Sequence, residues 1–198
     1  MSKVDPDHIK KERNKTIRWV VTIFLVTIFV SGAITLISDE IMIRSGLVTS
    51  FIILLLIVLI GIIFDIIGVA VTSADESPFH SMAARKVPGA KEALQLLRKA
   101  ERASSICNDV IGDICGVISG TAAATISAQL LVRFEFSWPA MVSLLMSALV
   151  SGLTVGGKAI GKTFAVNSST TIVHFVGRTI YALRSFFCRN SQKTNNNR

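Results

Sequence analysis

The 198-residue chain has little charge, few cysteines and no alternation of strand and helix patterns. Asp, Glu, Lys and Arg make up 17% of it, against about 25% in a soluble globular domain. This scarcity argues against a soluble enzyme domain and against a disordered chain. The three cysteines, Cys107, Cys115 and Cys188, are an odd number at no metal spacing. They argue against a disulfide-rich secreted protein and a zinc site, and we expect reduced thiols.

Hydrophobic residues, by contrast, make up 51% of the chain and lie in long blocks. Crossing a hydrocarbon core of about 30 Å takes roughly 20 helical residues, and an isolated strand would leave backbone groups unpaired in lipid. The sequence therefore predicts an all-α, polytopic membrane protein. Its four transmembrane helices are expected at about residues 19–38, 45–72, 108–132 and 136–157. The first is too long for a signal peptide and is expected to be a retained anchor.

Two further helices are expected beside the membrane, within a helical membrane domain over residues 18–187. Residues 163–187 are apolar but carry three ionisable side chains, as an interfacial helix or a tilted, partly inserted one does. Residues 90–103 gather alanines and leucines on one face. That face suits either an anionic membrane surface or the protein's own helices. A basic tail, residues 1–17, and a polar tail, residues 188–198, complete the chain.

The Lys and Arg residues alternate between connecting segments, and this pattern predicts the orientation. The N-terminal tail has six, the first loop one, the second loop six, the third loop one, and the region from Lys158 onward seven. Because cytoplasmic loops are enriched in these residues, we expect both termini and the second loop in the cytoplasm of a cell-membrane protein. The net charge of +8 then needs no nucleic acid partner, and the lipid bilayer is the expected partner.

Charged residues at the inner ends of the predicted spans are costly and therefore informative. Asp65 lies in the second span, Asp109 and Asp113 begin the third, and Lys158 and Lys162 end the fourth. They are compatible with a buried ion-pair cluster, which Thr163 would adjoin. The alternative, which the residue types favour less than structural pairing, is an oxygen-lined site for a hard divalent cation such as magnesium. The candidate metal ligands are Asp65, Ser73, Asn108, Asp109 and Asp113.

Residues 156–163 match the phosphate-binding pattern G-x-x-x-x-G-K-[ST]. That cradle requires a preceding strand and a following helix in an α/β sheet. Here a membrane span precedes the pattern, so we expect no nucleotide and interpret the glycines as loosening or kinking a helix end. No other constellation suggests catalysis, and we expect that the protein is not an enzyme.

Three segments resemble the transmembrane domain of the cyclin-M/CorB/CorC magnesium transporters, also called hemolysin-C-like. Residues 64–73, FDIIGVAVTS, are similar to the family's F-S-x-x-E-x-A-L-x-S. Residues 89–102, GAKEALQLLRKAER, are similar to its G-A-x-x-A-x-x-L-L-x-x-P-E-R linker, and Ile111-Gly-Asp113 follows where the family has I-G-N. Residues 157–165, GKAIGKTFA, are similar to G-E-x-x-P-K-T-x-A. The resemblance implies a homodimer and a buried magnesium site.

The chain departs from the family at the positions that would line that site. Asp65 replaces a serine and Gly68 a glutamate, while Lys158 replaces a second glutamate. The family's asparagine corresponds to Asp113, or to Asn108 in a shifted register. A lysine in place of a carboxylate would repel a divalent ion.

The match is therefore degenerate, and no CBS domains are expected after Cys188. Two interpretations stay open. One is cation binding or transport; the other is a non-transporting scaffold or accessory subunit with a vestigial ion site.

Overall fold

The computed structural model describes the backbone of residues 6–134 and 138–195, and the side chains of residues 17–42, 44–134 and 138–186. Within these ranges every regular element is a helix, as the sequence predicts. In chain order the elements are α1 (Pro6–Arg44), α2 (Leu47–Ser73), α3 (Ser77–Ala84), α4 (Ala90–Leu97), α5 (Ala100–Ser105), the π-helix η1 (Ile106–Gly112), α6 (Asp113–Phe134), α7 (Pro139–Asn167) and α8 (Ser169–Asn195).

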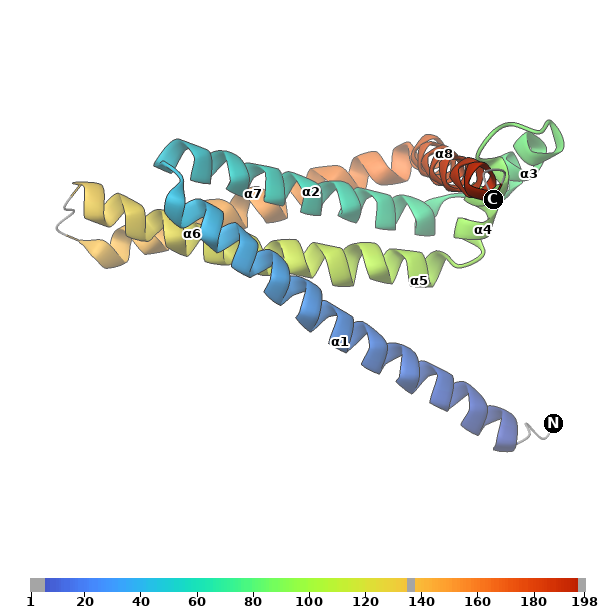
Figure 1. Ribbon diagram of the computed structural model, residues 1–198, viewed down its shortest axis with the longest axis horizontal. Helices are drawn as coiled ribbons and strands as arrows, with labels where there is room; N and C mark the ends of the chain where they lie inside the picture. Colours follow the sequence, from blue (N-terminus) through green and yellow to red (C-terminus); the bar gives the residue numbers. More distant parts are fainter. Residues whose placement is uncertain (1–5, 135–137, 196–198) are drawn as a thin grey trace.

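Four of the helical rods are long and apolar enough to cross a membrane, which confirms the predicted number of spans. They cover Ile17–Met42, Leu47–Ser73, Ala100–Phe134 and Pro139–Asn167. The third joins α5, η1 and α6. Figure 1 shows α3, α4 and α8 together at one end of the molecule, where α5 begins, and the connections α1–α2 and α6–α7 at the other. We call these the α8 end and the hairpin end.

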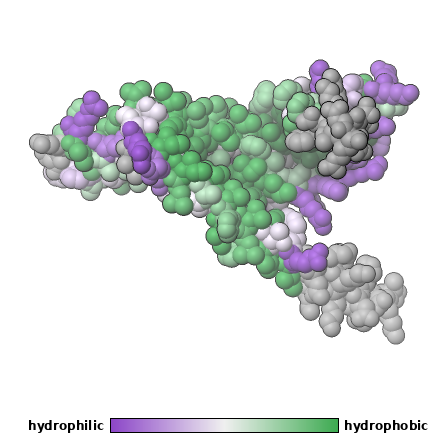
Figure 2. All heavy atoms as spheres, viewed as in Figure 1, coloured by the Kyte–Doolittle hydropathy of each residue, from purple (hydrophilic) through white to green (hydrophobic). Residues whose placement is uncertain are grey.

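The surface is apolar along the middle of the molecule. Figure 2 shows hydrophobic side chains over this region and hydrophilic ones at the two ends. Large side chains that would be buried in a soluble protein are exposed, among them Phe29 at 83% and Leu36 at 73%. An exposed apolar band of this extent is what a bilayer-embedded protein presents to lipid.

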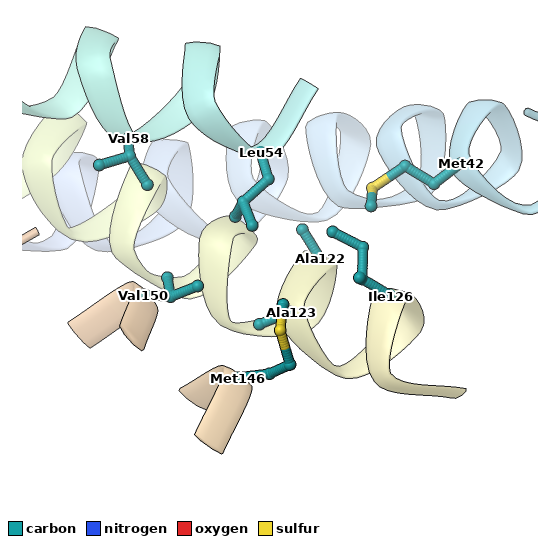
Figure 3. Close-up of a cluster of buried hydrophobic side chains, with 8 residues drawn as sticks. All are labelled: Met42, Leu54, Val58, Ala122, Ala123, Ile126, Met146 and Val150. Carbon is teal, nitrogen blue, oxygen red and sulfur yellow. The ribbon is translucent and has the colours of Figure 1, made fainter. Parts of the chain in front are cut away.

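At the hairpin end, α1, α2, α6 and α7 share an apolar core. Its buried side chains, labelled in Figure 3, are Met42, Leu54, Val58, Ala122, Ala123, Ile126, Met146 and Val150. Alanines on α6 let the neighbouring helices approach closely, as small residues do in membrane bundles. The core therefore joins α2, α6 and α7 near the hairpin end, and among the described side chains of α1 it includes Met42.

The first span leaves the bundle after this contact. It packs mainly against α6 and diverges toward the N-terminus (Figure 1). Polar groups fix the junction. Gln129 Nε2 donates a hydrogen bond of 2.8 Å to the Met42 carbonyl, and the buried Ser50 hydroxyl donates to the same carbonyl at 3.4 Å. Gln129 thus bonds an unsatisfied carbonyl in the last turn of α1, where helices lack internal partners.

At the α8 end, a second core joins α2, α3, α4, α7 and α8. Its buried members are Ala70, Val71, Phe79, Ala93, Leu94, Leu97, Ala165 and Val173. The apolar face of α4 is therefore packed against the protein's own helices. Of the two alternatives that the sequence left open for residues 90–103, the structure has this one.

Two glycines allow α4 and α8 to touch backbone to backbone. Gly89, which precedes α4, has a positive φ of 85°, a conformation that other residues rarely adopt. A Cβ atom there would lie 2.5 Å from the Arg178 backbone nitrogen, and one on Gly177 would lie 2.5 Å from the Gly89 carbonyl oxygen. Any larger side chain at either position would force the two helices apart.

Several helix boundaries differ from those predicted. The helix expected at 90–103 is divided at residues 98–99, since Leu97 is buried in the second core while α5 begins the third span. The helix expected at 163–187 is divided at Ser168, so that Ala165 and Val173 both reach that core. The α1 helix begins at Pro6 within the predicted basic tail, and α8 continues to Asn195 in the predicted polar tail.

Candidate functional site

A buried acidic side chain lies in the second span, where the sequence predicts one. Asp65 is 5% exposed. Its Oδ1 atom lies 4.0 Å from Nζ of Lys158, which α7 supplies and which is a quarter exposed. This is the distance of a loose ion pair. Because an unpaired charge in a membrane span costs at least about 2.5–3.5 kcal/mol, the lysine is a necessary neighbour for the aspartate if both are ionised.

Asn108 approaches the same face of α2 from the π-helix. A Cβ atom built on Gly68 would overlap Oδ1 of Asn108, so the asparagine side chain occupies the space that a residue at position 68 would need. Its Nδ2 atom donates a hydrogen bond of 3.2 Å to the Ser104 hydroxyl. Asp65, Asn108 and Lys158, from three different spans, are called here the intramembrane polar cluster.

The π-helix links the two halves of this cluster. Gly112, at its last turn, lies under Lys158, whose Nζ is 3.6 Å from the position that a Cβ atom would take. The π-helix therefore places the Asn108 amide against α2, and it places Gly112, which has no side chain, against Lys158. Short π segments within α-helices occur frequently at functional sites.

Two hydrogen-bond acceptors of the intramembrane polar cluster have no donor among the described residues. Oδ2 of Asp65 and Oδ1 of Asn108 are buried, and neither accepts a hydrogen bond from any residue that the structure describes. A buried acceptor without a donor costs about 1–3 kcal/mol. These two oxygens are the feature of the cluster that packing alone leaves unexplained.

The other predicted site residues lie apart from the cluster. Ser73 is exposed at the end of α2, and Asp113 is exposed at the start of α6. Asp109 is exposed and accepts a hydrogen bond from Ser105 in the preceding turn. Lys162 and Thr163 are also exposed on α7. Within the described ranges no three His, Cys, Asp or Glu side chains come together as a metal site would require.

The structure distinguishes between the two registers considered for the asparagine-like position. Asn108 faces α2 and Gly68, whereas Asp113 points away from the cluster. The sequence could not decide this, because a π-helix has more residues per turn than the α-helix on which the spacing was read.

Two glycines in the segment of the phosphate-binding pattern, Gly157 and Gly161, pack against α2, whereas Gly156 faces open space. The α7 helix is continuous through residues 156–163. Cβ atoms on Gly157 and Gly161 would overlap the side chains of Ile62 and Ile66 on α2. Their four-residue spacing within an apolar span is the signal that could have identified this contact. A helical backbone uses its N–H groups internally and offers no phosphate cradle.

The two cysteines with described side chains are free thiols. Cys107 lies in η1, and Cys115 packs against Gly61, whose Cβ position would be 3.0 Å from the Cys115 Cβ atom. The side chain of Cys188 lies outside the described residues. Both described thiols are partly buried between helices.

The described architecture defines a multi-pass helical membrane protein. Comparison with known protein families, with curated proteins and with solved structures found no match. The function therefore has to be argued from the intramembrane polar cluster.

Proposed function

We propose that this protein is a non-transporting membrane scaffold or accessory subunit in which Lys158 occupies the place of a cation beside Asp65. The observation that carries the proposal is the 4.0 Å approach of Lys158 Nζ to the buried Asp65. An internal ammonium beside the only described acid of the cluster balances its charge one to one. The dispersal of Ser73, Asp109 and Asp113 supports the same interpretation.

A second candidate function, cation binding or transport, is supported by the two buried oxygens without donors. Oδ2 of Asp65 and Oδ1 of Asn108 are hard ligands of the kind that magnesium takes. The resemblance of residues 64–73, 89–102 and 157–165 to CorB-type transporters supports this candidate too. A bound ion would have to displace the Lys158 ammonium, since two cations repel strongly at this range.

One double-mutant cycle separates the two functions. Under the first, Lys158→Met leaves the buried Asp65 carboxylate unpaired and lowers the unfolding free energy by about 3–5 kcal/mol. Asp65→Asn leaves only a quarter-exposed ammonium unpaired, so its loss is smaller. The double variant recovers part of this loss, since both charges are removed. Unfolding of the purified chain in detergent measures all three variants. The pair Asp113→Asn and Lys162→Met is the control, expected within about 0.5 kcal/mol of the native chain.

The same proteins are then heated with and without magnesium. The first function predicts no rise in melting temperature for the native chain. The second predicts a rise that grows in Lys158→Met and vanishes in Asp65→Asn, because a ligand stabilises the state that binds it. Additive losses without any magnesium effect would contradict both.

The cluster is also proposed to lie toward the cytoplasmic side of a cell membrane, with both termini cytoplasmic. The alternation of Lys and Arg residues along the chain supports this orientation. A homodimer is proposed on the resemblance to the transporter family alone.

A further inference from the structure

A cleft between α1 and the start of the third span combines an apolar wall with basic side chains. It has a volume of about 350 Å³, and Trp19, Leu96, Lys99, Arg102, Ile106 and Ile180 are among its lining residues. A second hollow of about 250 Å³ also borders Trp19 and Arg102. The cleft arises because α1 touches the bundle at the hairpin end and diverges toward the other (Figure 1).

The cleft lies where two spans begin. Trp19 lies beside Arg18 near the polar end of the first long apolar segment, and Arg102 lies in the first turn of the 35-residue helical rod Ala100–Phe134. Tryptophan prefers the level of the lipid headgroups, with its ring partly in hydrocarbon. A tryptophan at that level would set the polar mouth of the cleft at headgroup depth, with its apolar flank facing the hydrocarbon.

Its basic groups are available to a ligand. Lys99 and Arg102 are exposed, and neither side chain makes an ion pair or hydrogen bond with any described residue. Glu92 and Glu101 also border the two hollows without pairing to them. Arg18, next to Trp19 in the chain, adds a third exposed cation at the same level of α1.

We infer that this cleft binds the headgroup phosphate of an anionic phospholipid from the surrounding bilayer. Lys99 and Arg102 hold the phosphate, Trp19 packs along the glycerol region, and an acyl chain follows the diverging face of α1. Basic pockets between transmembrane helices at the membrane surface are known to take such headgroups. Lys99, Arg102 and Arg18 exceed Glu92 and Glu101 by one positive charge, which favours an anionic over a zwitterionic lipid by on the order of fivefold.

The fluorescence of Trp19 can report on this site. The chain has one other tryptophan, Trp138, which has to be removed first. Trp138 begins the fourth span at the hairpin end. In a Trp138→Phe variant, Trp19 fluorescence is measured in bilayers that contain brominated phosphatidylglycerol or, at the same mole fraction, brominated phosphatidylcholine. The expected result is stronger quenching by the anionic lipid, which is lost when Lys99→Gln and Arg102→Gln are added.

The control changes Arg85→Gln and Lys86→Gln, two exposed basic residues that follow α3 and do not line the cleft. This pair is expected to keep the preference, and circular dichroism verifies that every variant is folded. Three outcomes would overturn the inference: equal quenching by both lipids, an equal loss in both charge-removal pairs, or full competition by millimolar inorganic phosphate. The last would mean that the cleft binds free anions and no lipid.

Discussion

At the scale of single residues, the centre of the molecule depends on a glycine and an asparagine that share one space. Gly68 has no side chain, and Asn108 fills the volume that one would take. The CorB-type motif that residues 64–73 resemble has a glutamate at the position of Gly68. Here the Asn108 amide, from another helix, occupies the space beside that position.

Gly68→Ala should therefore destabilise the protein through overlap with Asn108. The expected loss in unfolding free energy is about 1–3 kcal/mol, the cost of overpacking a filled interior. Adding Asn108→Ala should restore much of it by vacating the space. Gly116→Ala, at an open position of α6, is the matched control and should be close to neutral. Thermal unfolding in detergent measures each variant, and equal losses with and without Asn108 would contradict the assignment.

Sequence reasoning found the members of the polar cluster but not their arrangement. Asp65, Lys158 and Asn108 were all candidates, because polar groups in apolar spans are conspicuous. The exposure of Asp109, Asp113 and Lys162 could not be predicted. Whether a side chain faces the neighbouring helices or the outside depends on where the π-helix lies and on how each helix is rotated about its axis. Neither can be predicted from the composition.

At the scale of elements, the attachment of α1 rests on a small junction. Gln129 from α6 bonds the Met42 carbonyl, and the rest of the first span shares little buried surface with the bundle. Gln129→Ala should cost about 0.6–1.5 kcal/mol, the range for an interhelical hydrogen bond in a membrane protein.

Distances between spin labels on α1 and α6 should broaden in Gln129→Ala, since the junction limits the angle between these helices. Thr125→Ala provides the control, because the Thr125 hydroxyl bonds only a carbonyl of its own helix. An unchanged distance distribution in Gln129→Ala would show that packing around Met42 alone fixes α1.

The spans themselves were predictable because their apolar lengths match the bilayer. The divisions at residues 98–99 and at Ser168 were not. Neither place has a glycine or proline, and the helices end there because Leu97, Ala165 and Val173 must all reach one core. Tertiary packing overrides local preference at both points.

At the scale of the whole molecule, the alternation of basic loops predicts a labelling pattern in intact cells. The test uses single cysteines in a background where Cys107, Cys115 and Cys188 are serine. Gly46→Cys, exposed between α1 and α2, should react with a membrane-impermeant maleimide. Ser77→Cys, exposed at the start of α3, should react only after lysis. The reverse pattern would place both termini outside.

The unequal lengths of the connections have a consequence for recognition. On the hairpin end only Ser45 and Gly46 separate α1 from α2, and a similarly short link joins α6 to α7. If the proposed orientation holds and this end faces outward, the described residues there leave little protein surface beyond the lipid for an antibody, a protease or a ligand to bind. A soluble partner is then expected to bind at the opposite end, at the surface formed by α3, α4 and α8.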